Sequence, residues 1–474
     1  MKNLRNIFAI SAVAACFTLT AETFDITPGT LGELVGTQGA TITELTLKGR
    51  ADARDMAFIR DMASLKKLDM SALSIEGCTT DKEIFFGDRI FNAGAIPSFA
   101  FSCTGIEEVT LPSTLQAIGD GAFSSSKLKV IKGGSAVTKI GDWAFYGCNA
   151  LTEIELPATV ATLGKGVFAN CTALGSASLE KTKITVLPEQ SFFNTPALRT
   201  IKLPSTLTAI DDEAFYGSGL SDVALSGNVH IVGAHSFSGM PNLESFQSGD
   251  IENGQGAFFN NPHLKHFHSE VTSVNHYGLA HCPSLVLGET GNDSPMLHAN
   301  MLNDLALAHN ASTGIVFGNT LQSVGKEVLS GMKNLNSVNV YLLEGNVPQT
   351  VPGSFDGIKP ENISLMVDKN HIETWKADPE WGRFNIQGVS LSTDDIILDG
   401  PESIVFELEG NVLRISAPEE IGNVLITDAS GMMLLAMAPG DTTVEIDITD
   451  MPQAVLLARA VTSKGARTFK FQRR

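Results

Sequence analysis

The side chains best suited to chemistry are two histidines near the middle of the sequence. His266 and His268 lie two residues apart in a segment that alternates like a strand, so both imidazoles face the same side. Such a pair can hold a zinc ion with a third ligand, and His263 and Glu270 are near enough in sequence to supply one. Solvent-facing strand positions also accept any polar residue. We favour this second interpretation and expect no metal and no cofactor.

Carboxylates and glycines also occur in patterns that invite comparison with active sites. Glu107 and Glu108 are adjacent, and Glu153 and Glu155 alternate, but acidic residues at such spacings are ordinarily solvated on an exposed strand. The phrase IGDGAF at residues 118–123 has no lysine and serine after it and opens no predicted helix, so it is not a phosphate-binding loop. The sequence therefore indicates a protein without catalytic activity.

A repeated phrase decides the fold into which these residues are built. Six-residue copies that end in phenylalanine or leucine recur at intervals of 21 to 27 residues. A period of this size is the signature of a solenoid. We call the last residue of each copy the anchor. The strong copies end at Phe101, Phe123, Phe145, Phe168, Phe192, Phe215, Phe237 and Phe258, and weaker copies end at Leu279, Leu302, Leu329 and Phe355.

Each repeat carries one short predicted strand. In LTEIELP, residues 151–157, apolar side chains alternate with Glu153 and Glu155, which indicates a strand with one buried face. The proline ends the strand because it cannot donate to the ladder. The same pattern recurs at residues 106–112 and 198–204. We expect an α/β or mainly β solenoid in which these strands form a parallel sheet and the phenylalanines form a ladder across the core.

The outward positions of these strands form the candidate ligand-binding surface, which we call the strand face. It is polar and lacks the Trp, Tyr and Arg side chains that usually dominate protein interfaces. With only 4 tyrosines and 3 tryptophans against 26 phenylalanines, we expect the aromatic residues to be mostly anchors. A weak, multivalent contact, a polar ligand such as a glycan, or binding elsewhere would fit. The candidates are Glu108, Thr110, Lys132, Glu153, Glu155, Ser176, Ser178, Thr200, Lys202, Asp222, Gln247, His266 and His268.

Three of the five cysteines beyond residue 21 occupy one recurring slot. Cys148, Cys171 and Cys282 each follow an anchor by three residues, which indicates a small buried side chain. Cys148 and Cys171 belong to adjacent repeats and could approach the distance of a disulfide. The slot explains these cysteines without a bond, and the disulfide stays open.

The net charge bears on the class of partner, and the N-terminus bears on the cellular location. A formal charge of −19 repels phosphate backbones and argues against nucleic-acid partners. Lys2 and Arg5 precede a short apolar stretch at residues 7–19, as in an export signal, and we expect cleavage after Ala21. A lipidation motif ending at Cys16 is the alternative. No later segment is long and apolar enough to predict a membrane span.

The composition changes after residue 388, where the anchors stop. Short alternating segments separated by turn residues predict a small antiparallel β-sandwich over residues 389–474. We expect strands at residues 404–408, 412–416, 424–428, 432–437, 443–448, 455–460 and 468–471.

The repeat resembles the BspA-type leucine-rich repeats of bacterial surface proteins. The strand phrases at residues 151–157 and 198–204 and the anchor phrases at 118–123 and 140–145 carry the resemblance, which extends over about residues 42 to 384. It implies an exported solenoid, here residues 96–388, with an N-terminal cap and first repeats at 22–95. It also implies a closing segment with two tryptophans, Trp375 and Trp381. Some members of this family bind host matrix proteins or other cells.

The C-terminal region resembles the sorting domain of the type IX secretion system. Residues 424–431 look like its first motif, residues 451–460 look like its proline-led strand, and Gly465 and Lys470 complete the pattern. Ala454 and Leu456 depart from the glycine and tyrosine that are common at those places. Such domains also occur as sandwich modules without a role in secretion.

Two functions fit these observations. The first is an exported binding module or adhesin for a host or bacterial surface protein or glycan, with the strand face as its site. The second is a structural spacer or assembly component of the cell surface that has no ligand of its own. The sequence does not determine the oligomeric state.

Overall fold

A computed structural model gives the fold. It describes residues 20–85, 87–271, 273–285, 299–317, 321–340, 347–389, 396–398, 404–428, 433–437, 439–449, 451, 455–462 and 465–472. Cys16 lies outside these residues, and so does the predicted export signal except for its residues 20 and 21. The chain divides into two compact units, residues 1–167 and 168–474, and each is described by itself. The predicted boundaries at 95/96 and 388/389 stay predictions.

The first unit is a stack of parallel strands with two short helices at its start. One sheet has the order β1-β2-β3-β7-β9, and a second, of two-residue strands, has the order β12-β10-β8-β6. The helices are α1 (Leu31–Val35), η1 (Gly36–Ala40) and α2 (Ala53–Arg60). The strands are β1 (Thr20–Ile26), β2 (Ile42–Ala51), β3 (Lys67–Ile75), the hairpin of β4 (Cys78–Thr79) and β5 (Ile90–Phe91), β6 (Ala95–Ile96), β7 (Glu108–Leu111), β8 (Ala117–Ile118), β9 (Val130–Gly133), β10 (Lys139–Ile140), β11 (Glu153–Glu155) and β12 (Thr162–Leu163).

The predicted N-terminal cap is held by two buried aspartates. The Asp52 carboxylate accepts from the backbone N–H of Arg54, and Asp55 accepts from the N–H of Asp52, which makes a capping box at the start of α2. Asp55 also accepts from the backbone N–H groups of Gly29 (2.7 Å) and Leu31 (3.0 Å). One carboxylate therefore satisfies the beginnings of both helices. Helix α2 ends at Arg60, before β3.

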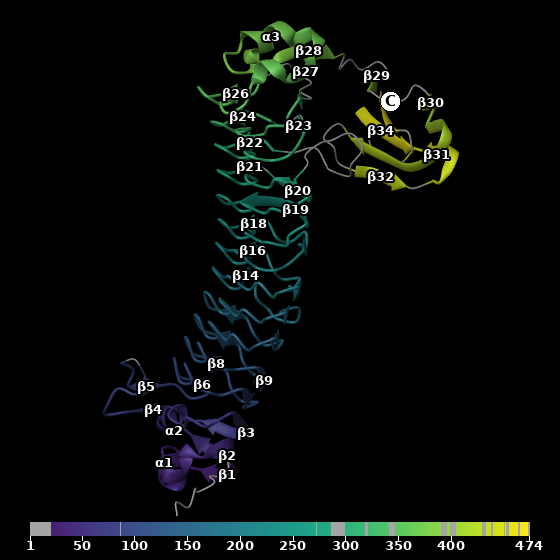
Figure 1. The fold of residues 1–474 in the computed structure, drawn as a ribbon. Coiled ribbons are helices and arrows are strands. Elements are labelled where there is room, and N and C mark those ends of the chain that lie inside the picture. The colour runs from purple at the N-terminus through teal and green to yellow at the C-terminus, as the bar shows by residue number, and fades with distance from the viewer. Residues whose placement is uncertain are drawn as a thin grey trace, which may run out of the picture. The chain divides into compact units, whose positions relative to one another are not determined.

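The second unit continues the same architecture with strands on two sides of each repeat (Figure 1). One side has β13 (Ser176–Ser178), β15 (Thr200–Lys202), β17 (Asp222–Ala224), β19 (Ser245–Asn253), β20 (His266–Val271), β23 (Gly314–Phe317), β25 (Ser337–Val340), β27 (Ser364–Asp368) and β28 (Asn385–Val389). The other has β14 (Val186–Leu187), β16 (Ala209–Ile210), β18 (Ile231–Val232), β21 (Ser273–Val274), β22 (Met301–Leu302), β24 (Ser323–Val324) and β26 (Gln349–Thr350). All of these strands that pair with one another do so in parallel.

The phenylalanine anchors form the predicted ladder in each unit. Every anchor from Phe101 to Phe258 is at most 1% exposed. In the first unit the ring centroids of Phe101, Phe123 and Phe145 are 5.4 and 5.5 Å apart. In the second, successive centroids from Phe168 through Phe192, Phe215 and Phe237 to Phe258 are separated by 5.4, 5.5, 5.3 and 5.6 Å.

The turn that carries each anchor has its own hydrogen-bond ladder. The N–H of Phe192 donates to the carbonyl of Ala214 at 2.7 Å, and the N–H of Asn194 donates to Tyr216 at 2.7 Å. The residues two before and two after the anchor have positive φ, as at Gln190 (58°) and Asn194 (51°). Each repeat is thus pinned to the next on its turn side by main-chain bonds as well as by the buried ring.

One predicted anchor is wrong. The copy assigned to Leu302 ends instead at Leu307, because Leu302 lies in β22 opposite Val274 and Val324. The anchor bonds run from the N–H of Leu307 to Val328, and Leu305, two residues earlier, has the positive φ of 57°. The stretch before this repeat contains residues 286–298, outside the described part, and the longer interval concealed the shift.

The solenoid closes as predicted on a pair of buried tryptophans. Trp375 in α3 (Ile372–Ala377) and Trp381 in η4 (Trp381–Arg383) are 2% and 0% exposed, with centroids 5.2 Å apart. Trp381 packs against the anchor Phe355 at 4.5 Å and donates from its indole N–H to the carbonyl of Pro348 at 3.0 Å. Two further 3-10 helices are η2 (Pro360–Asn362) and η3 (Lys369–His371).

The C-terminal region is an antiparallel sheet, as expected. The residues predicted as two strands at 412–416 and 424–428 form one strand, β31 (Val412–Asp428), which pairs with β30 and β33 along its first half and with β32 and β34 mainly along its second. Buried residues such as Leu413, Ile426 and Phe471 form its core. The other strands are β29 (Ile396–Leu398), β30 (Val405–Glu409), β32 (Met433–Met437), β33 (Asp441–Asp447), β34 (Val455–Thr462) and β35 (Gly465–Gln472).

The three cysteines of the recurring slot are buried, as predicted, and all five described cysteines are free thiols. The Cys148 thiol donates to the carbonyl of Phe123 at 3.1 Å, and that of Cys282 to Phe258 at 3.2 Å. Burial raises the pKa of Cys148 to about 11 and that of Cys282 to about 12. These thiols fill space and satisfy a carbonyl, and neither has the lowered pKa of a nucleophile.

Candidate functional site

The strand register gathers the predicted surface residues into two outward rows. In the first unit, Glu108 lies opposite Val130 and Thr110 opposite Lys132, while Glu153 and Glu155 flank the buried centre of β11. In the second unit one row holds Ser176 beside Thr200, then Asp222, Ser245 and His266, and the other holds Ser178 beside Lys202, then Ala224, Gln247 and His268.

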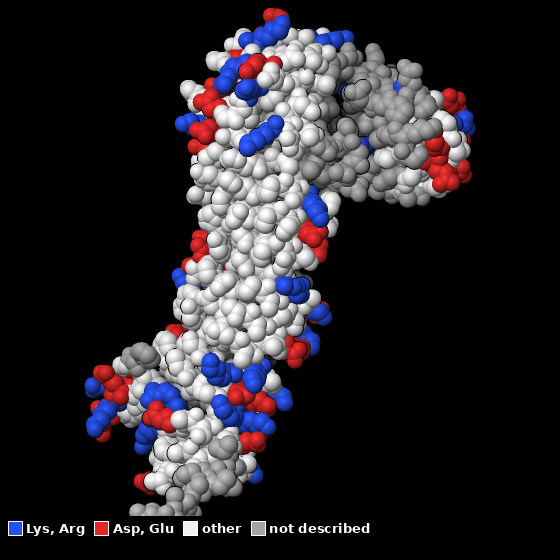
Figure 2. Space-filling model, in the orientation of Figure 1, with Lys and Arg blue, Asp and Glu red and all other residues white. Residues whose placement is uncertain are grey.

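The charges on and beside this face are paired between adjacent repeats. Glu107 lies 3.4 Å from Lys66 and 2.6 Å from Lys129, and hydrogen bonds from these two lysines lower its pKa. In the second unit Glu180 lies 3.7 Å from Lys202. Exposed pairs of this kind stabilise little. Figure 2 shows charges of both signs interspersed on the viewed face, with much of the solenoid surface there uncharged, so no single-sign field marks a site.

From β7 to β20, within the described residues, the ladder of outward strands is interrupted at two places. β9 and β11 belong to different sheets, and so do β15 and β17. The central residue of the strand before each break, Ile131 or Ile201, is only half-buried, whereas the corresponding Val109 and Val223 are 1% and 7% exposed. The missing neighbour leaves one side of each isoleucine uncovered.

The spacing between the anchor and the strand changes at the second break. From an anchor to the first leucine of its strand there are six residues in the repeat of Phe192 (Leu198) but five in that of Phe215 (Leu220). The shortening falls at Gly219, where a Cβ would lie 2.1 Å from the Pro196 carbonyl oxygen. At the first break, between β9 and β11, the same spacing instead lengthens, from five residues after Phe123 to six after Phe145. A change of loop length between neighbours does not always separate strands, because β17 still pairs with β19.

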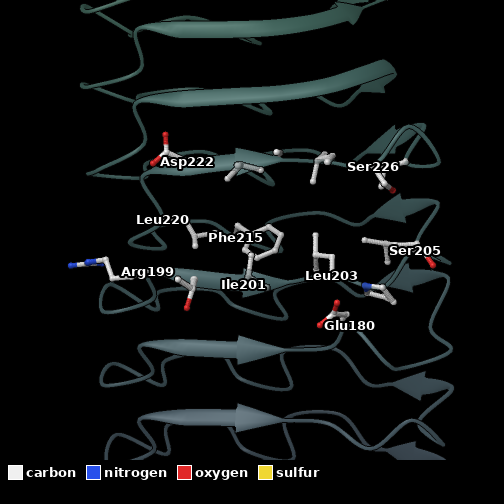
Figure 3. A pocket seen from close by; sticks show the side chains of 16 residues that line it. Glu180, Arg199, Ile201, Leu203, Ser205, Phe215, Leu220, Asp222 and Ser226 are labelled. Atoms are coloured by element: carbon white, nitrogen blue, oxygen red, sulfur yellow. The ribbon is translucent and has the colours of Figure 1, made fainter.

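A cavity of about 530 Å³ opens on the strand face at the second break. Figure 3 shows Ile201, Leu203, Phe215 and Leu220 between the two separated strands. The floor is therefore apolar and reaches the anchor Phe215. The polar side chains of the rim are Glu180, Arg199, Thr200, Ser205, Asp222 and Ser226.

Arg199 ties the two repeats together beside the cavity. Its guanidinium donates to the Pro196 carbonyl at 2.8 Å and to the Gly219 carbonyl at 2.9 Å. This side chain bridges the repeats at a point where the strands have no main-chain bonds. Sequence reasoning listed Thr200, Lys202 and Asp222 on this face but missed the cavity. Its only signal was the five-residue spacing.

A second surface that sequence reasoning missed lies on the turn side. Tyr146, Tyr216 and Tyr277 are 37%, 38% and 37% exposed. Phe193 stacks on Tyr216 with centroids 5.2 Å apart, and His281 stacks on His309 at 4.4 Å. Only 9 of the 26 phenylalanines are anchors, so the expectation that aromatic residues are mostly anchors is wrong, and these exposed tyrosines are among the exceptions.

The histidine pair belongs to a single strand. His266 and His268 both lie in β20, opposite Ser245 and Gln247. Within the described residues no three His, Cys, Asp or Glu side chains are grouped closely enough to hold a metal ion. Across those same residues, no helix has the length and apolar character needed to cross a membrane.

Comparison with known families matches the repeats directly. Residues 94–198 and 178–286 match the BspA type leucine rich repeat region, in 6 copies. These segments are similar to BspA-type leucine-rich repeats. No curated protein matches the sequence.

Several solved structures match this chain at low sequence identity. A leucine-rich repeat protein from Bacteroides ovatus is 19% identical over 66% of this chain and 92% of its own, with a TM-score of 0.43. A leucine rich cell surface protein from Faecalibacterium prausnitzii is 20% identical over 57% and 88%, with a TM-score of 0.33. The pneumococcal vaccine antigen PcpA is 17% identical over 66% and 87%, with a TM-score of 0.34.

Proposed function

We propose that this chain is an exported, non-catalytic binding protein of the bacterial cell surface that holds its partner on the strand face. One observation carries the proposal: the outward rows of polar residues lead to a cavity of about 530 Å³ with an apolar floor. Pockets of 300 to about 1,000 Å³ with apolar walls and a few polar groups are the usual form of binding sites. A spacer without a ligand has no need of such an opening.

Non-catalytic action follows from the groups at the cavity. Its titratable side chains are Glu180, Arg199 and Asp222. Glu180 is paired with Lys202, and Arg199 is engaged with backbone carbonyls. No nucleophile with a neighbouring base lies there, so the arrangement supports recognition rather than reaction.

The proposal is tested with the mature chain, residues 22–474, on arrays of matrix proteins and glycans. We expect binding that falls at least tenfold in Asp222→Lys and in the double variant Glu153→Lys, Glu155→Lys. Tyr216→Ala, on the turn side, is the matched control and should bind normally. Loss of binding in the control alone would move the site to the turn side. Absence of any binding, with the protein isolated inside a larger surface assembly, would favour the spacer.

We propose in addition that the C-terminal sheet directs the protein to the cell surface through type IX secretion. Its support is the sequence resemblance of residues 424–431 and 451–460, together with a core of its own around β31. Deletion of residues 389–474 should trap a folded solenoid in the periplasm, as followed by fractionation and immunoblotting. Normal surface display of the deletion variant would contradict this role.

A further inference from the structure

The break between β15 and β17 leaves main-chain groups without partners in the middle of a sheet. On β15, the N–H of Thr200 donates to Gly175 and the carbonyl of Lys202 accepts from Leu179 at 2.8 Å, so both residues face β13. In a strand, alternate residues direct their N–H and C=O groups to opposite neighbours. Ile201 and Leu203 therefore face β17.

The facing edge of β17 is free in the same way. The carbonyl of Ser221 accepts from Glu244 at 2.7 Å and the N–H of Leu225 donates to Gln247 at 2.8 Å, so these residues face β19. The main-chain groups of Asp222 and Ala224 face β15. Both strands lie wholly in the described part of the chain, and there no hydrogen bond joins them. Two unpaired edges thus face each other.

The rest of the two repeats keeps ordinary spacing, so the opening is confined to this face. On the opposite side β14 pairs with β16, and the anchors Phe192 and Phe215 stack at 5.5 Å. The cavity lies between the free edges, and its apolar floor includes Ile201, Leu203 and Val223. The opening combines donors and acceptors at strand spacing with room for an apolar side chain.

We propose that an extended segment of a partner polypeptide enters this split, pairs its main chain with the free edges of β15 and β17, and places an apolar side chain in the cavity. This rests on the proposed function, whose partner it specifies. Peptide backbone repeats donors and acceptors along an extended line and matches a sheet edge residue by residue. A glycan has no such periodic pattern of alternating N–H and C=O groups.

Charge narrows the chemistry of the segment. Glu180 and Asp222 stand on the rim, and the whole chain carries a net charge of −19. Arg199, the rim cation, is already hydrogen-bonded to the carbonyls of Pro196 and Gly219. The segment that fits has an apolar central residue with basic or neutral neighbours, since acidic neighbours would meet the Asp222 carboxylate and a Glu180 carboxylate whose exposed pair with Lys202, at 3.7 Å, is weak.

The free edges can be tested without any ligand, by amide hydrogen exchange of the mature chain. Leu179 and Leu203 occupy the same place in successive repeats, but only Leu179 donates to the following strand, at the Lys202 carbonyl. We expect the Leu203 amide to exchange at least tenfold faster than the Leu179 amide. Equal protection of the two amides would show that the strands are paired in solution and would overturn the proposal.

The partner is tested with an array of synthetic octapeptides probed with the mature chain. The best binder is compared with the same peptide N-methylated at alternate residues, which removes main-chain donors and keeps every side chain. We expect N-methylation to weaken binding at least tenfold, and peptide to slow exchange at residues 199–204 and 220–226. Unchanged binding after N-methylation overturns strand pairing. Glycan binding with no peptide binder also overturns it and leaves the proposed function standing.

Two matched substitutions locate the site. Ile201→Arg places a charged side chain in the split, at a residue that is already half-buried. Ile131→Arg makes the same change at the other break, between β9 and β11. We expect Ile201→Arg to weaken peptide binding at least tenfold and Ile131→Arg to leave it unchanged. The circular dichroism of both variants should match that of the parent. Loss in Ile131→Arg alone would overturn the assignment to β15 and β17.

Discussion

In the second unit, the turn side and the strand side of the same repeats differ in regularity. On the turn side, every anchor from Phe168 to Phe258 stacks on the next within a narrow range of 5.3 to 5.6 Å. On the strand side the ladder stops at β15 and resumes at β17. The difference shows that one regular side is enough to hold neighbouring repeats together. The other side is then free to open a cavity without ending the stack.

The largest expected effect tests whether the turn side holds the repeats. Phe192→Ala removes a fully buried ring between two stacked neighbours, and we expect a loss of about 3–5 kcal/mol in the free energy of unfolding. The adjacent Phe193→Ala removes a half-buried ring stacked on Tyr216, which should cost about 0.5–1.5 kcal/mol. Chemical denaturation measures both. Equal losses of unfolding free energy in the two variants would show that the anchor ladder stabilises the stack no more than this half-buried contact does.

The next effect uses pH to probe the buried slot behind the anchors. Burial raises the pKa of the Cys148 thiol from 9.0 to about 11 in the folded chain. A raised pKa means that the folded state holds the proton more tightly, so this stabilisation is complete below pH 9 and is lost as the pH rises towards 11. Two pKa units correspond to about 2–3 kcal/mol.

Denaturation between pH 8 and 11 measures this loss, with Cys148→Ala as the comparison. The variant is less stable at neutral pH but should show a flatter decline, because the titrating thiol is gone. Parallel declines in the two proteins would contradict the assignment of the alkaline slope to this cysteine.

On the strand side, at the break between β15 and β17, we expect truncation of a strand residue to cost less unfolding free energy. Ile201 is half-buried, so Ile201→Ala should cost about 1–2 kcal/mol, below the range of about 2–5 for a fully buried isoleucine. Ile154→Ala, at a strand centre that is 6% exposed, supplies the comparison. Denaturation curves that rank the two variants in the opposite order would show that β15 is covered in solution.

The smallest expected effect concerns the side chain that bridges the break. Arg199→Ala removes hydrogen bonds to the carbonyls of Pro196 and Gly219 at an exposed site, and we expect a loss of about 0.5–1.5 kcal/mol. Both bonds come from one guanidinium nitrogen, Nη1, and the ammonium of lysine stands on a stem of different length and geometry, so Arg199→Lys should not restore both bonds. A variant Arg199→Lys as stable as the parent would show that the bridge depends on charge alone.

Much of the fold could be predicted because each repeat repeats its own local signals. The alternation of residues 151–157 correctly predicted β11 with its buried centre, and the tryptophans of the closing segment are buried as expected. The anchor at Leu302 was misplaced because LHANML and LNDLAL overlap and both end in leucine. Only the pairing of Leu302 with Val274 decides between them. The split of β31 into two strands failed for a related reason, since polar residues in its middle resemble a turn.

The candidate surface was predicted more completely than the candidate site. Alternation identified which residues of each strand face outward, among them Thr200, Lys202 and Asp222, because side-chain direction in a strand is a local property. The cavity beside them is not local. It depends on whether Ile201 and Ala224 of successive repeats come within hydrogen-bonding distance, and no pattern within either repeat contains that information.

The sequence by itself determined the period, the inward anchors and the outward rows, because backbone preference and alternation act over a few residues. The tertiary structure decided where the strand ladder breaks, which apolar residues line the opening and which aromatic side chains of the turns stay exposed. Those features arise from the fit between neighbouring repeats. The spacing from Phe215 to Leu220 is one residue shorter than that from Phe192 to Leu198, but only the packed repeats show that β15 and β17 do not pair.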